Sequence, residues 1–199
     1  MYHMLELTDD RSERIRYDFA DYPVYIRRGK LSYYPNYAAP SHWHDDIELI
    51  AVLSGEMEYH INGQCISMQT GEGVFVNTRQ MHFGGSDRHE DCEFLCVLFH
   101  PLLLCGLPAM ERDFVLPLLE APEAPYVKLQ ANAPWQRRIL EYIREIYEKK
   151  DALPLHLQPL LWGVWSILFE NQPKASQRPL APGDDLAVMK NMVGFIQSH

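Results

Sequence analysis

The stretch His-Trp-His-Asp-Asp-Ile-Glu, residues 42–48, decides the fold because it puts three metal-binding side chains on a short β-like segment. Alternate residues of a strand share a face, so His42, His44 and, further along, Glu48 can point the same way. A further histidine, His82, lies beyond the turn-rich residues 71–73. The spacing therefore predicts that two imidazoles and a carboxylate enter one interior, with His82 on a neighbouring strand.

This side-chain set suits two kinds of site. Neutral imidazoles and a carboxylate bind divalent zinc, nickel, manganese or iron, and three histidines with one carboxylate would leave coordination positions open. The same residues could bind a polar ligand without a metal. They could also be buried histidines that form hydrogen bonds with Glu48 and the backbone.

Length and charge limit what surrounds the site. A chain of 199 residues suffices for one domain with a sizeable core and an appendage. Eighteen Lys and Arg against 27 Asp and Glu give a net charge of −9, so the chain should not bind nucleic acid by itself. No apolar run reaches the roughly 20 residues of a membrane span, and the N-terminus lacks a signal-peptide pattern. We expect a cytoplasmic protein without a membrane partner.

Residues 20–100 contain short β-like runs separated by turn signals. The clearest is Asn62-Gly63, a dipeptide that favours the two-residue turn of a β-hairpin. Residues 48–53 are continuously apolar after Glu48, as in a strand covered on both faces. The pattern predicts a mainly β fold, an antiparallel β-barrel or jelly roll.

After Pro101 the periodicity becomes helical. Four prolines between residues 102 and 126 predict short helical turns and loops that wrap the barrel. We expect one helix capped by Asn132 and running through Lys150, and a second that starts between residues 155 and 159 and ends near residue 171. The fold class is thus a β-barrel followed by an α-helical pair.

The second helix carries a seam with heptad-like steps of four, three and four residues. Such a seam suits a second copy of the same helix, which predicts a homodimer. The alternative is an internal core helix of a monomer. The predicted dimerisation residues are Leu157, Leu161, Val164 and Leu168.

Beyond this helix the composition changes again. Residues 172–183 are rich in proline and polar residues and are typical of a linker. Residues 184–199 predict a helix with an apolar stripe, which we interpret as the start of a further domain. The predicted domains are therefore a barrel with wrapping segments (1–130), a helical dimerisation hairpin (131–171), the linker and this last helix.

Residues 41–55, the Asn62-Gly63 hairpin, residues 71–82 and the strand ending in Phe99-His100-Pro101 resemble the N-terminal cupin-type regulatory domain of AraC-type bacterial transcription regulators. The resemblance covers most of the chain. It implies a barrel that binds a small effector, a helix that dimerises, and DNA binding through a C-terminal double helix-turn-helix domain. Only the first helix of that domain would be present here.

His42, His44, Glu48 and His82 match the four metal positions of the cupin family residue by residue. The turn before His82 departs from the pattern of metal-binding cupins, because Asn77 stands near the usual proline and the following glycine is missing. We therefore expect that no cofactor is required, although a divalent metal remains compatible with the ligand types.

The favoured function is that of a sensor, not an enzyme. A small-molecule effector would enter the barrel and shift the balance between domain arrangements by about 1 to 3 kcal/mol. Arg79 could pair with an effector carboxylate or phosphate. The predicted effector-binding residues are His42, His44, Glu48, Tyr59, Phe75, Arg79, His82 and Phe94.

The sequence leaves two alternative functions open. A metal-dependent cupin enzyme, an oxygenase, isomerase or lyase, would react at the open positions of the metal. A pure dimerisation module would fill its barrel with side chains and leave no ligand cavity.

Overall fold

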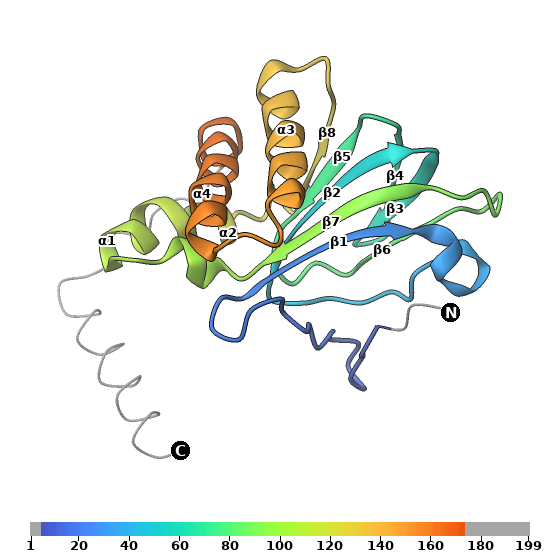
Figure 1. The fold of residues 1–199 in the computed structure, drawn as a ribbon, viewed down its shortest axis with the longest axis horizontal. Helices are drawn as coiled ribbons and strands as arrows, with labels where there is room; N and C mark the ends of the chain where they lie inside the picture. Colours follow the sequence, from blue (N-terminus) through green and yellow to red (C-terminus); the bar gives the residue numbers. More distant parts are fainter. Residues whose placement is uncertain (1–4, 174–199) are drawn as a thin grey trace.

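The computed structural model describes residues 5–173 and contains two antiparallel β-sheets with helices over one of them (Figure 1). The five-stranded sheet has the order β1 (Val24–Lys30), β7 (Glu93–Phe99), β2 (Ile47–Ser54), β5 (Gly73–Val76) and β8 (Tyr126–Leu129). The three-stranded sheet has the order β4 (Gln64–Gln69), β3 (Glu56–Ile61) and β6 (His82–Gly85). The mainly β, antiparallel fold class is confirmed.

The hairpin between β3 and β4 forms at the predicted dipeptide. Asn62 and Gly63 have φ angles of 50° and 81°, the left-handed values that a type I′ turn requires. The strands pair from Ile61 opposite Gln64 outward, without an irregularity. The local turn chemistry therefore sets the register of the three-stranded sheet.

Strand β2 is buried on both faces, as its apolar run predicts. Leu49 and Ala51 belong to a core between the five-stranded sheet and the helices. Ile50 and Val52 belong to a second core between the two sheets. The alternation of a strand thus separates a helical core from an inter-sheet core, and the candidate site lies on the inter-sheet side.

The segment after β7 forms short helical turns, as its prolines predict. These are η3 (Pro101–Leu104), α1 (Pro108–Met110), the π-helical turn η4 (Glu111–Val115) and α2 (Leu116–Leu119). Strand β8 was not expected. It adds to the edge of the five-stranded sheet beside β5, where Tyr126 pairs with Val76.

Asn77 anchors this segment to the end of β5. Its buried amide donates hydrogen bonds to the carbonyl oxygens of Leu118, Leu119 and Ala124 at 3.1 to 3.2 Å. Its side-chain oxygen accepts a bond from the backbone N–H of Thr78. Asn77 therefore connects the loop that leads to His82 with the end of α2.

The helical pair is confirmed, with shifted ends. Helix α3 (Pro134–Glu148) has Ala133 at its N-cap position, without a side-chain hydrogen bond, so Asn132 is not its cap. Pro134 suits the first helical position, where the N–H that proline lacks would have no partner within the helix. Helix α4 (Pro154–Asn171) contains Pro159 in its second turn, on the exposed side of the helix. Figure 1 shows α4 beside α3, while α3 contacts the five-stranded sheet.

The prediction placed the dimer seam on the wrong face of α4. Each of its four side chains is fully buried within one chain, as part of the helical core. Helix α3 and the η3–α2 segment cover this face, so a partner cannot reach it. The internal-core alternative therefore holds for Leu157, Leu161, Val164 and Leu168.

The predicted linker beyond residue 173 and the helix over 184–199 lie outside the described residues. Within residues 5–173, the helices are too short or too polar for any of them to cross a bilayer.

Candidate functional site

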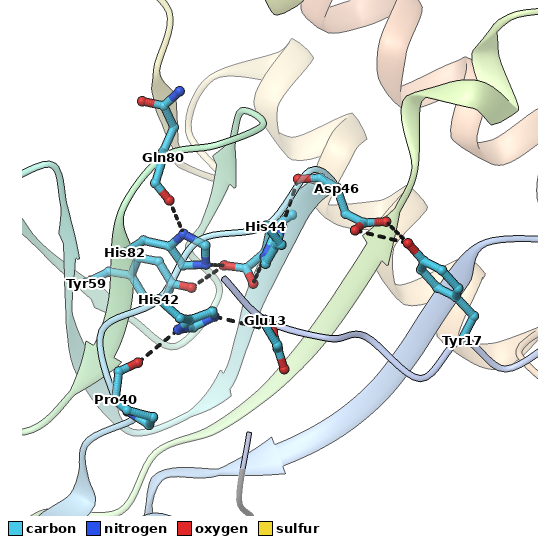
Figure 2. A network of polar contacts seen from close by, with 10 residues as sticks. Glu13, Tyr17, Pro40, His42, His44, Asp46, Tyr59, Gln80 and His82 are labelled. Carbon is cyan, nitrogen blue, oxygen red and sulfur yellow. Dashed lines mark hydrogen bonds and ion pairs between the residues drawn. The ribbon is translucent and has the colours of Figure 1, made fainter. Parts of the chain in front are cut away.

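The histidine-rich segment joins the two sheets. His42 and His82 form an isolated antiparallel bridge, with backbone N···O distances of 3.1 and 2.8 Å. His82 opens β6 of the three-stranded sheet, whereas Glu48 lies in β2 of the five-stranded sheet. The rings of His42, His44 and His82 gather between them, with centroids 4.4 to 5.8 Å apart (Figure 2).

All three rings are held in the same way. Nδ1 contacts a backbone carbonyl oxygen two residues away in each case: Pro40 for His42 at 2.9 Å, Asp46 for His44 at 3.0 Å and Gln80 for His82 at 2.8 Å. A carbonyl oxygen can only accept, so each Nδ1 carries the proton. Each neutral ring therefore has its lone pair on Nε2, and Nε2 faces the centre of the cluster.

Glu48 supplies the fourth acceptor at this centre. Its oxygens lie 3.7 Å from Nε2 of His44 and 3.5 Å from Nε2 of His82, and its Oε1 accepts a hydrogen bond from the Tyr59 hydroxyl. Among the described residues, neither Nε2 has a hydrogen-bond partner, and both are buried. Buried acceptors that face one another are costly unless a positive charge lies between them.

The cluster fits a divalent metal. His42, His44, Glu48 and His82 each offer one ligand atom, and these atoms lie within 4.8 Å of one another. The carbonyl contacts at Nδ1 are the outer interactions that usually fix metal-binding histidines. A proton shared between His44 and Glu48 would supply a positive charge in a second way.

The directions of the pKa shifts in the cluster are consistent with a positive charge at its centre. Burial alone would raise the pKa of Glu48, but His82 and His44 lower it well below its usual range. Burial alone would lower the pKa of His44, but the adjacent Glu48 makes the net shift upward. His42 differs, since burial and the neighbouring His82 lower its pKa to about 4, so its ring is neutral at pH 7.

Glu13 is a second carboxylate at the site, which the sequence did not reveal. The segment before β1 runs beside residues 41–46, where the N–H of Glu13 donates to the Trp43 carbonyl at 2.8 Å and Ser12 bridges to Trp43. This places Glu13 Oε2 3.5 Å from Nε2 of His42, with 13% of the side chain exposed. Burial raises the pKa of Glu13 to about 7. No local motif marks Glu13, because only tertiary packing brings it here.

A cavity of about 230 Å³ opens from the cluster between the two sheets. Four of the predicted effector residues line it, and His44 and His82 lie beside them in the cluster. The remaining walls are mainly aromatic and aliphatic. The predicted residues on the wall are His42, Glu48, Tyr59 and Phe94.

Two predicted effector residues lie elsewhere. Phe75 is fully buried in the helical core, since its strand neighbours Val74 and Val76 take the inter-sheet side. Arg79 has a side chain that is 74% exposed and donates to Asp45 at 2.6 Å from a left-handed turn position, with φ 61°. Neither residue can contact a ligand in the cavity as placed.

Comparison with protein families gives a match to the AraC-like ligand binding domain over residues 27–178. The chain belongs to this family. A related protein is the uncharacterized HTH-type transcriptional regulator YdeC of Bacillus subtilis, 26% identical over 203 residues. That alignment covers 99% of this AraC-like domain chain and 66% of the regulator, so the chain spans a little under two thirds of its relative.

Solved structures with partial likeness include a predicted oxalate decarboxylase from Thermotoga maritima, at 28% identity and a TM-score of 0.34 over 38% of this chain and 64% of that one. The polyketide cyclase RemF from Streptomyces resistomycificus matches at 27% identity and a TM-score of 0.36, over 41% of this chain and 57% of that one. Scores of this size do not support a functional inference for the AraC-like domain.

The buried carboxyl of Glu13 predicts a pH-dependent stability. An acid whose pKa rises on folding, here from 4.5 to about 7, favours the folded state below pH 4.5 and loses that contribution as the pH passes through 7. As the pH rises from 4.5 to above 7, the unfolding free energy of wild type should therefore fall by about 1 to 3 kcal/mol more than that of Glu13→Gln, as measured by urea denaturation. The exposed Glu90→Gln variant should follow wild type. Parallel pH curves for wild type and Glu13→Gln would contradict this burial effect.

Proposed function

We propose that this chain is the effector-sensing part of an AraC-type transcription regulator. The observation that carries the proposal is the cavity between the sheets, with a buried polar cluster at one end, in a member of a ligand-binding family. Apolar walls with a few convergent polar groups are typical of small-molecule sites. DNA would be bound by a C-terminal double helix-turn-helix domain absent from this chain. The net charge of this chain, −9, disfavours DNA binding by the chain itself.

A bound effector would act on both sheets at once. The cluster contains Glu48 from β2 and His82 from β6, and the loop before His82 is tied through Asn77 to the end of α2. A ligand that preferred one arrangement of this loop by about 1 to 3 kcal/mol would shift the helical segment with it. The cavity argues against a pure dimerisation module with a filled interior.

A divalent metal at the cluster is a second candidate, favoured by the Nε2 atoms of His44 and His82, which have no hydrogen-bond partner within residues 5–173. His42, His44, Glu48 and His82 would hold zinc, nickel, manganese or iron. Bound there, the ion would supply the central positive charge and a Lewis acid beside the cavity. Sensing does not require it, and we propose that the chain is not an enzyme.

We also propose a homodimer formed through the outward face of α4. Leu155 is 74% exposed, and the residues on this face follow heptad steps of four and three. Leu153 before the helix is 67% exposed and extends the apolar surface. The corrected seam consists of Leu155, Pro159, Trp162, Ser166 and Phe169.

The domain organisation completes the proposal. Residues 1–130 would form the effector-binding unit, 131–171 the dimerisation hairpin, 172–183 the linker, and 184–199 the first helix of the DNA-binding domain. Such a regulator would act in the cytoplasm.

Effector binding should depend on the free volume of the cavity. Cys96 lines the wall, so Cys96→Phe should fill the space without altering the cluster. Cytosolic small-molecule fractions that raise the Tm of wild type by several degrees should leave this variant unaffected, whereas the exposed-site control Cys65→Phe should respond as wild type. Equal responses in both variants would contradict binding in the cavity. Recovery of the bound compound as a chemically changed product would favour the cupin enzyme instead.

Metal content tests the second candidate. After growth with zinc, nickel, manganese and iron salts, purified protein should hold about one metal ion per chain, measured by elemental mass spectrometry. His44→Ala should reduce this at least about tenfold, because it removes a ligand. Exposed His156→Ala should retain it. Metal-free wild type under all four conditions would leave protons as the source of the central charge.

The two faces of α4 should respond differently to a charge. Trp162→Asp on the half-buried outward face should convert a dimer to a folded monomer in sedimentation experiments. Leu161→Asp should abolish cooperative unfolding, because a carboxylate in the helical core lacks a partner. A Trp162→Asp protein that keeps the dimer mass, or a monomeric wild type, would contradict this interface.

A further inference from the structure

Two carboxyl groups reach the inner end of the cavity, beside the histidine cluster. Glu13 and Glu48 both line it. Arg27 and Arg28 also line it, but their side chains are 48% and 50% exposed and already pair with Asp18 and Glu93. The histidine cluster offsets the charge of Glu48, so an effector carboxylate or phosphate would meet the like charge of ionised Glu13 at this end.

The two carboxylates differ in what they contact. Glu48 accepts a hydrogen bond from Tyr59 and lies between two histidines, so it serves the cluster. Glu13 Oε2 lies 3.5 Å from Nε2 of His42, whose ring proton is on Nδ1, so this nitrogen has no proton to donate. When Glu13 is ionised, it and His42 therefore face each other as two acceptors, and an N–H donor between them would satisfy both.

Aromatic residues surround this pair of acceptors. Tyr25, Tyr34 and Phe94 line the same cavity as Glu13, together with further tyrosines at positions 33 and 59. Carboxylate and aromatic walls in one cavity are the chemistry that recognises organic cations.

We propose that the effector is a small organic ammonium ion with an apolar or aromatic body, and that Glu13 is the residue that selects it. The inference rests on the proposed effector-sensing function and names its ligand class. The ammonium N–H groups donate to Glu13 Oε2 and His42 Nε2, and the apolar body lies against Phe94 and the tyrosines. A metal on the three histidines and Glu48 would occupy His42 Nε2 and leave Glu13 Oε2 as the acceptor of the ammonium N–H groups.

The test uses three probes of similar length: phenethylamine, phenethyl alcohol and hydrocinnamate, which are a cation, a neutral molecule and an anion. Calorimetric titration of the purified chain, with and without a chelator, should show the amine binding at least about tenfold more tightly than the other two. Glu13→Gln keeps the shape of the side chain but removes its charge. It should bind the amine about tenfold more weakly, whereas Glu90→Gln should match wild type.

The outcomes separate this inference from the function on which it rests. Urea denaturation of Glu13→Gln measures its folding separately, so a loss of amine binding by a cooperatively folded variant cannot be assigned to poor folding. Tighter binding of the alcohol or the carboxylate, no binding of the amine, or equal amine binding by Glu13→Gln would overturn the ligand class. None of these outcomes affects the cavity-filling test with Cys96→Phe, which reports on effector binding of any class.

Discussion

Three imidazole lone pairs and one carboxylate converge in the interior, and the structure around them depends on the positive charge that this arrangement requires. His42, His44 and His82 cannot turn away, because each ring is fixed by a backbone carbonyl at Nδ1. Glu48 cannot leave, because it is buried within β2. Such a group of acceptors is tolerated only with a proton or a metal ion at its centre. Since its members come from both sheets, the same charge also holds the sheets together.

The rest of the chain positions this cluster and gives it a cavity. Asn77 ties the loop that leads to His82 to the helical segment, and the N-terminal segment brings Glu13 to His42 at the cavity wall. The cluster is thus linked to the helices on one side and to the ligand space on the other. This arrangement is suited to a sensor, because a ligand at the cavity can alter contacts that extend beyond it. Membership of the AraC-like ligand binding domain family supports the same assignment, that of a ligand sensor.

The sequence predicted what local rules determine and failed where packing decides. The His42, His44 and Glu48 alternation and the Asn62-Gly63 turn are local, and the structure confirms both placements. The prediction that Phe75 contacts an effector was wrong. The face on which Phe75 lies depends on the register of β5, and the sequence of this short strand does not reveal the register because all four of its residues are buried. The α4 seam was wrong because the helix is apolar on most of its surface, so periodicity could not choose the covered face. Glu13 was missed because no motif precedes it and only the tertiary fold brings it to His42.

The protonation pattern of the histidine rings tests the central claim most directly. Long-range proton–nitrogen correlation NMR at neutral pH distinguishes a proton on Nδ1 from one on Nε2 in each ring. With Nδ1 donating to the carbonyls of Pro40, Asp46 and Gln80, all three rings should show a protonated Nδ1. Nε2 of His42 should be unprotonated. A bare Nδ1 in any of the three rings would show that the lone pairs do not converge and would contradict the account.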